Sequence, residues 1–126
     1  MPYLVDSDVL IDVYRGNIRA GEYIDTLPQR WALSQVSALE LIVGARNKEE
    51  VARTDKFLSD YVIVPLQGSA GVRAYELLKK YAKSHALQVF DSLIAATAIE
   101  ESLTLVTRNR KHFAMIEGLN LEVPQY

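Results

Sequence analysis

Short apolar runs alternate with longer stretches of mixed polarity along the chain. These runs are too short for helices and predict buried strands, at residues 3–5, 31–33, 61–64, 103–106 and 121–123. The stretches between them carry apolar residues at helical spacing and predict helices, over residues 9–14, 19–27, 37–46, 49–60, 69–85 and 91–102. The last of these helices is apolar nearly all round, which is typical of a helix buried on every side.

Strands separated by helices indicate an α/β fold. Such strands pair in parallel through right-handed crossovers, so we expect a sheet of four or five parallel strands with helices on both faces. In open parallel sheets, ligands bind outside the carboxyl ends of the strands. The chemistry of this protein is therefore expected in the residues that directly follow the apolar runs.

Composition narrows the classes of function. The 126 residues predict one domain, 1–126, and 49% hydrophobic with 24% charged residues is ordinary for a globular protein. The absence of cysteine excludes disulfides, zinc ribbons and thiol nucleophiles, and fits a reducing cytoplasm. No run approaches the roughly 18 apolar residues of a membrane span, so we expect a cytoplasmic protein without membrane contact. A formal net charge of −2 argues against binding nucleic acid by bulk charge and leaves room for a local basic patch.

Acidic residues gather at the predicted strand ends. Asp6 follows the first strand, Glu40 lies shortly after the second, and Asp91 opens the buried helix. Three carboxylates that converge on one cleft repel one another, and an oxygen-lined acidic cleft is a natural site for Mg²⁺ or Mn²⁺. A divalent ion held there can activate water and neutralise the charge of a phosphodiester.

The same acids also have structural interpretations. Asp91 precedes an apolar helix and is a good N-cap, while Ser37 with Glu40 three residues later has the spacing of a capping box. Asp8 is a candidate cap of the first helix. Asp6 is harder to explain structurally, because a charge at the end of a buried strand is costly unless it is used.

Four segments resemble the motifs of PIN-domain nucleases. In chain order they are LVDSDVLI at 4–11, SQVSALELIVG at 34–44, FDSLIAATA at 90–98, and LVTRN at 105–109 with His112 and Phe113 after it. Each motif alone is weak, whereas four in order along the whole chain are strong. Together with the compact length they are similar to VapC-type toxins of toxin–antitoxin pairs.

The resemblance implies a PIN-like three-layer α/β/α sandwich. It further implies an endoribonuclease that depends on Mg²⁺, with Mn²⁺ as a substitute, and that is inhibited by a cognate antitoxin protein. It also implies a homodimer. The apolar residues of 10–14 and 39–43 exceed what one sheet face needs, which fits such an assembly.

The resemblance assigns roles position by position. Asp6 and Asp91 match the principal metal-binding aspartates, and Glu40 matches their acidic partner. Asn109 stands where many members have a fourth acid; its amide oxygen carries no charge, which favours one well-ordered ion. Three further positions are expected to support the site: Ser7, Asp8 and Thr107. Three basic residues are expected to make weak contacts to RNA phosphates: Arg108, Arg110 and Lys111.

Two other functions fit parts of the pattern. Asp6-Ser7-Asp8 after a strand also fits a haloacid-dehalogenase-like phosphatase, in which Asp6 attacks phosphorus and Asp8 acts as general acid. Asn109 in place of an acid motivates a catalytically silent PIN-type scaffold that binds RNA without cleaving it. His112 has no partner at ligand spacing and is expected at the surface or at a phosphate.

Overall fold

The computed structural model describes residues 2–28 and 30–126. Its centre is a five-stranded sheet in which every neighbouring pair is parallel, with the order β3-β2-β1-β4-β5. The strands are β1 (Tyr3–Val5), β2 (Trp31–Ser34), β3 (Val62–Val64), β4 (Thr104–Val106) and β5 (Leu121–Glu122). The predicted α/β class and parallel pairing are confirmed.

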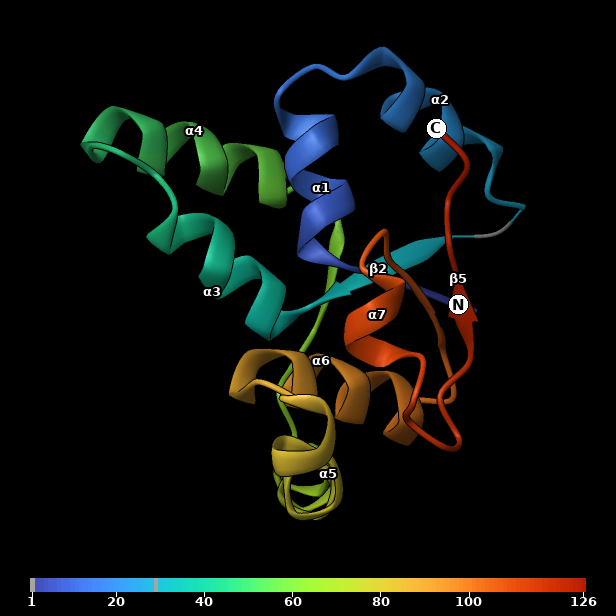
Figure 1. Ribbon diagram of the computed structural model, residues 1–126. Coiled ribbons are helices and arrows are strands. Elements are labelled where there is room, and N and C mark those ends of the chain that lie inside the picture. Colours follow the sequence, from blue (N-terminus) through green and yellow to red (C-terminus); the bar gives the residue numbers. More distant parts are fainter. Residues whose placement is uncertain (1, 29) are drawn as a thin grey trace.

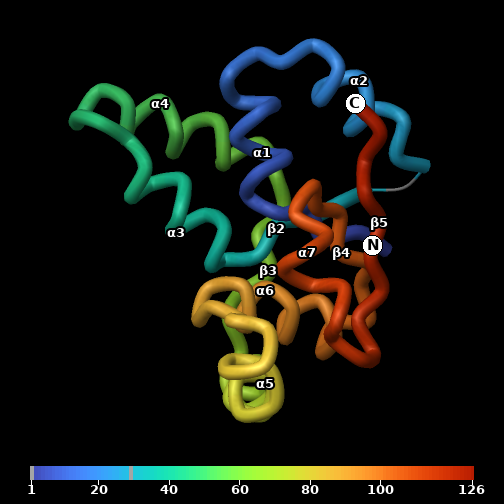
Figure 2. The backbone as a smooth tube through the Cα atoms, viewed as in Figure 1, coloured from blue at the N-terminus to red at the C-terminus, as the bar shows by residue number. Residues whose placement is uncertain are grey.

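Helices cover both faces of this sheet (Figures 1 and 2). They are α1 (Ser7–Tyr14), α2 (Ile18–Thr26), α3 (Gln35–Val43), α4 (Lys48–Leu58), α5 (Gly68–His85), α6 (Val89–Glu100) and α7 (Arg110–Phe113). Successive residues of a strand point to opposite faces, so Leu4 of β1 joins the core beneath α5 and α6, whereas Val5 joins the core beneath α1 and α2. The expected three-layer α/β/α sandwich is confirmed.

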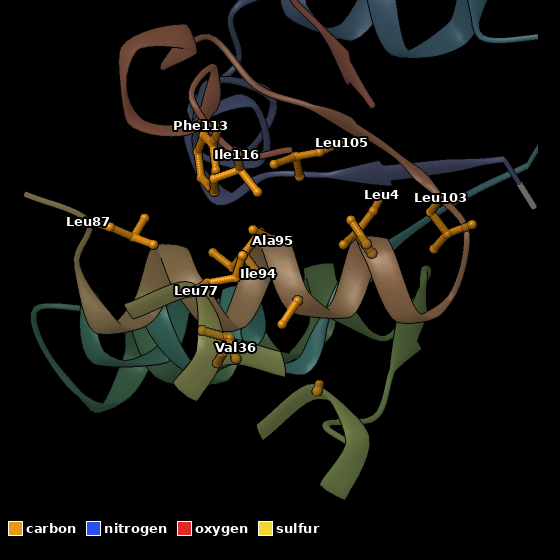
Figure 3. Close-up of a cluster of buried hydrophobic side chains, with 14 of the residues drawn as sticks. Leu4, Val36, Leu77, Leu87, Ile94, Ala95, Leu103, Leu105, Phe113 and Ile116 are labelled. Atoms are coloured by element: carbon orange, nitrogen blue, oxygen red, sulfur yellow. The ribbon is translucent and has the colours of Figure 1, made fainter. Parts of the chain in front are cut away.

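Among the helices within the described residues, α6 has the most buried side chains. It packs between the sheet and α5, and its residues Ala95, Ala96 and Ala98 are fully buried. These small side chains let the helix approach the sheet closely, while Ile94 fills the space towards the larger cluster drawn in Figure 3. The N-terminus of α6, which carries Asp91, is therefore held by a packed core.

Helices α1, α3 and α6 each begin two residues before the predicted start. Helix α3 begins at Gln35, and the Ser34 side chain caps it by accepting the Ser37 N–H at 3.0 Å. The capping box predicted for Ser37 and Glu40 is therefore not formed, because the hydroxyl that ends β2 already takes that place. Helix α6 begins at Val89, so Asp91 lies inside the first turn and is not the N-cap.

Helix α7 was not predicted, because four residues are too few to show helical periodicity. It is anchored by Phe113, which is fully buried against the α6 side of the sheet. No helix within residues 2–28 or 30–126 is both long and apolar enough to cross a membrane.

Candidate active site at the carboxyl ends of the strands

The two central strands deliver the first components of the site. β1 and β4 are neighbours, with Val5 opposite Val106, so the residues that follow them lie side by side at one edge of the sheet. These residues are Asp6 and Thr107, which are 4% and 0% exposed. The rule that chemistry gathers at the carboxyl ends of parallel strands holds here.

Asp6 is held by two hydrogen bonds at opposite ends of its carboxylate. Oδ1 accepts the backbone N–H of Ser7 at 2.7 Å and makes Asp6 the N-cap of α1, and Oδ2 accepts the Thr107 hydroxyl at 2.8 Å. Burial raises the pKa of Asp6, and these two bonds oppose that rise. The structure therefore keeps a buried carboxylate in one orientation at the mouth of the sheet.

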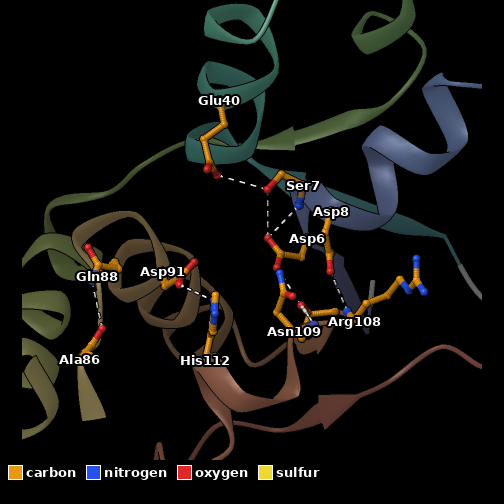
Figure 4. Close-up of polar contacts among 11 residues, drawn as sticks. Asp6, Ser7, Asp8, Glu40, Ala86, Gln88, Asp91, Arg108, Asn109 and His112 are labelled. Atoms are coloured by element: carbon orange, nitrogen blue, oxygen red, sulfur yellow. Dashed lines mark hydrogen bonds and ion pairs between the residues drawn. The ribbon is translucent and has the colours of Figure 1, made fainter. Parts of the chain in front are cut away.

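Glu40 approaches Asp6 from α3 (Figure 4). The Ser7 hydroxyl lies 3.3 Å from Asp6 Oδ1 and 3.3 Å from Glu40 Oε1, and so bridges the two carboxylates. Burial and then the nearby Asp6 raise the pKa of Glu40. A hydroxyl has one proton for two acceptors, so part of the repulsion between the acids remains.

Asp91 enters from the first turn of α6 and has an unpredicted partner. The His112 Nδ1 lies 3.1 Å from Asp91 Oδ2, so α7 brings an imidazole to the third carboxylate. Burial raises the pKa of Asp91, whereas His112 opposes that rise. His112 was expected at the surface or at a phosphate, with no partner at ligand spacing. It is exposed, as expected, but its pairing with Asp91 was not predicted. No sequence signal indicates this pair, because α7 is too short to be recognised and its docking depends on Phe113.

Asp8 and Asn109, two further predicted site residues, make hydrogen bonds next to Asp6. Asp8 accepts the N–H groups of Val9 at 2.7 Å and of Arg108 at 2.9 Å. The Asn109 N–H donates to Thr107 Oγ at 3.1 Å. The segment after β4 is thus tied to the start of α1, and Asn109 lies beside Asp6 in Figure 4.

The three basic residues predicted to contact phosphate differ in their surroundings. Arg108 pairs with Asp12 at 3.0 Å and lies over the Tyr126 ring, and its side chain points away from the acids. Arg110 and Lys111 are exposed on α7. In this arrangement Arg108 serves the site through its backbone N–H, and its guanidinium is occupied elsewhere.

Comparison with known proteins identifies the architecture. A family profile for the PIN domain matches residues 3–119. The chain belongs to the PIN domain family. This PIN domain is 37% identical to ribonuclease VapC10 of Mycobacterium tuberculosis, over 92% of its own length and 89% of that relative. The resemblance to VapC-type proteins is thereby confirmed.

Solved structures agree with this assignment. A toxin–antitoxin complex from Klebsiella pneumoniae superposes with a TM-score of 0.78 at 32% identity, covering 93% of this PIN domain and 94% of that chain. VapBC2 from Rickettsia felis, bound to a promoter DNA fragment, superposes with a TM-score of 0.84 at 26% identity, covering 98% of each chain. The likeness thus extends over nearly the whole chain.

The donor atoms of this PIN domain suit a hard divalent cation. Among the described residues, no three acidic or imidazole side chains stand close enough to ligate one ion together. Mg²⁺ needs only one or two direct carboxylates, since it retains several waters. Asp6, Glu40 and Asp91 all have a raised pKa, and Asp6 raises that of Glu40. A cation would relieve that repulsion, so the residues fit such an ion.

We expect the metal-free protein to lose stability as pH rises from about 4 to about 6. Burial and the nearby Asp6 raise the pKa of Asp8 to about 6 from its ordinary 3.8. The folded state therefore binds more protons than the unfolded state in this window, and the free energy of unfolding falls with rising pH. The contribution of Asp8 is about 2 kcal/mol after allowance for its partial exposure.

Urea denaturation in EDTA at several pH values between 4 and 7.5 measures this slope. Asp8→Asn is the comparison, because it removes the titrating group and keeps one acceptor for a backbone N–H. We expect a clearly shallower slope in this variant, whatever its absolute stability. Equal slopes for the two proteins would show that Asp8 titrates normally.

Proposed function

We propose that this PIN domain is a metal-dependent endoribonuclease, the toxin of a toxin–antitoxin pair. The observation that carries the proposal is that Asp6 after β1, Glu40 of α3 and Asp91 of α6 lie near enough to one another to interact electrostatically (Figure 4). RNA as substrate is supported by the similarity to a ribonuclease. A cognate antitoxin partner is supported by the toxin–antitoxin complexes that share its fold.

The chain's own residues have separable tasks in this reaction. Asp6 and Asp91 would hold Mg²⁺ or Mn²⁺, and the bound ion supplies an activated water and compensates the charge of the scissile phosphate. Thr107 and the Ser7 N–H orient Asp6, and His112 orients Asp91. Glu40 is only partly buried and its raised pKa suits it to accept the proton of the attacking water.

The residues that follow β4 bear on both the metal and the substrate. Asn109 contributes an uncharged oxygen where a fourth acid would add charge, so we propose one well-ordered ion. Arg110 and Lys111 on α7 stay candidates for contact with RNA phosphates.

The hydrogen bonds of Asp8 argue against the phosphatase alternative, in which Asp8 is the general acid. A general acid must present a free carboxyl oxygen to the leaving group, whereas both oxygens of Asp8 accept backbone N–H groups. The fold is that of the PIN domain family, which removes the other support for this alternative.

Cleavage of single-stranded RNA tests the proposal. We expect hydrolysis in Mg²⁺ and in Mn²⁺ and its loss in excess EDTA, followed by recovery on addition of either metal. Undiminished cleavage in EDTA would contradict metal dependence. Binding of RNA without turnover in Mn²⁺ would instead identify the silent scaffold.

We further propose that the protein is a two-fold homodimer. Leu39 and Val43 are exposed on α3, beside a hollow of about 260 Å³ whose apolar lining includes Ile63. A second copy that places the same face against this one would bury these side chains on both sides. Light scattering at tens of micromolar that returned the mass of a single 14.2 kDa chain would contradict this assembly.

A further inference from the structure

A second cleft adjoins the carboxylates and has the opposite charge. It is a hollow of about 450 Å³ between the end of α1, the end of α3 and the first half of α4. Its lining contributes three guanidinium groups, those of Arg15, Arg46 and Arg53. The three helices stand next to one another on the same side of the sheet (Figures 1 and 2).

The single acid of this cleft, Glu50, positions arginines. Its Oε2 accepts Arg46 Nε at 2.9 Å and lies 3.9 Å from Arg53 Nη2. The Glu50 side chain is 15% exposed, whereas those of Arg46 and Arg53 are 83% and 64% exposed. The Glu50 carboxylate thus lies beneath the two guanidinium groups, which face solvent. Each guanidinium has five N–H groups, so both keep hydrogen-bond donors that Glu50 does not use.

The cleft carries a formal charge of +2, from three arginines and one glutamate, on a chain whose net charge is −2. Guanidinium groups match the planar, bidentate geometry of phosphate oxygens. A local basic cleft on an acidic protein indicates a site for an anionic ligand rather than a general attraction to polyanions.

This arginine cleft is connected to Glu40, one of the three acids of the candidate active site. A narrower hollow continues from it and shares Tyr14, Arg15, Gly44 and Glu50 with it, and the lining of that narrower hollow includes Glu40. A ligand that spans both hollows therefore lies over the arginines at one end and beside Glu40 at the other.

We propose that the arginine cleft of Arg15, Arg46 and Arg53 binds the phosphates of the RNA strand that flank the cleavage site. This inference rests on the proposed function and assigns part of its substrate path. The strand continues past Glu40, Asp6 and Asp91 to a hollow of about 390 Å³ lined by Asp91, Lys111 and His112. The path thus has basic groups on both sides of the acids, and Arg108, turned towards Asp12, is not part of it.

Salt dependence of RNA binding tests this path. The test variant is Arg46→Ala/Arg53→Ala, and the matched control is Lys79→Ala/Lys83→Ala, which removes the same charge from exposed residues of α5 on the other side of the sheet. Binding of a labelled single-stranded RNA oligonucleotide is measured across salt concentrations, with every protein in an Asp6→Asn background so that the RNA stays intact.

We expect the slope of log Kd against log salt to fall by about 1.4 in the arginine variant, since each phosphate contact on a single strand accounts for about 0.7. The lysine variant should keep the wild-type slope. In cleavage assays without the Asp6→Asn change, the arginine variant should show a raised KM with kcat little changed. Equal slopes for the two double variants would overturn the inference.

Two further outcomes separate this inference from others. If the wild type binds RNA with the expected slope but never cleaves it, the proposed function fails and the phosphate path stands. If the arginine variant keeps RNA binding but loses affinity for a poly-glutamate peptide, the cleft receives an acidic protein segment, and the inference is wrong.

Discussion

Asp6→Asn is expected to abolish RNA cleavage while leaving the metal-free protein at least as stable as the wild type. The carboxylate is 4% exposed and burial raises its pKa, so its charge is a cost in the absence of a cation. Asparagine keeps the N-cap, because its Oδ1 can accept the Ser7 N–H. Its amide can donate to Thr107 Oγ in place of the bond that the hydroxyl now donates.

The substitution Asp6→Asn is expected to raise the free energy of unfolding and to lower the cleavage activity. Relief of repulsion should add up to about 1–2 kcal/mol to the free energy of unfolding in EDTA, as at other sites where function costs stability. Activity should fall by well over about 100-fold, the upper range for losing a residue that merely supports a metal ligand. This combination distinguishes a metal-binding residue from a structural helix cap, whose loss would lower stability.

Thermal melts of the wild type, Asp6→Asn, Asp91→Asn and Asp91→Ala, each in EDTA and in Mn²⁺, measure this. Mn²⁺ at about 100 times its Kd should stabilise the wild type by about 2.7 kcal/mol and the variants far less. Asp91 accepts no capping hydrogen bond from the start of α6, so Asp91→Ala should lack the full cost of a lost cap. If the asparagine variants melt lower in EDTA and respond to Mn²⁺ like the wild type, the carboxylates are structural.

Phe113→Ala should lower the free energy of unfolding by about 3–5 kcal/mol. Phe113 is fully buried and packs with Ile116, Leu105 and Ile94 between the sheet and α6 (Figure 3). Removing the ring leaves a cavity that α7 alone cannot refill, because its neighbours belong to the sheet and to α6. The same ring anchors the segment that carries Asn109 and His112, so cleavage should fall as well.

Urea denaturation of Phe113→Ala against Phe90→Ala checks this prediction. Phe90 is 58% exposed, so the same substitution there should change stability by no more than about 0.5 kcal/mol. A loss below about 1 kcal/mol in Phe113→Ala would mean that α7 is not held by this side chain.

Much of the fold was predictable from local pattern, because burial on both faces demands unbroken apolar runs. Leu4 and Val5, or Leu105 and Val106, have no polar alternative when helices cover both sides of the sheet. The start of α6 was misplaced because Asp91 was taken as its N-cap, whereas the helix begins two residues earlier, at Val89. Backbone hydrogen bonding rather than side-chain pattern sets such a boundary.

The candidate site likewise has a part that the sequence predicts and a part that only the tertiary structure shows. By itself the sequence determined that Asp6 and Thr107 each follow a buried strand, at the edge of a parallel sheet where ligands bind. That β1 and β4 are neighbours, so that the Thr107 hydroxyl donates to Asp6, was decided by the tertiary structure. Only the tertiary structure decided that His112 contacts Asp91, that Arg108 turns to Asp12, and that Arg46 and Arg53 border the cleft of Glu40. These contacts join elements distant in the chain, and no periodicity encodes them; they follow from how α7, α1 and α4 pack on a shared core.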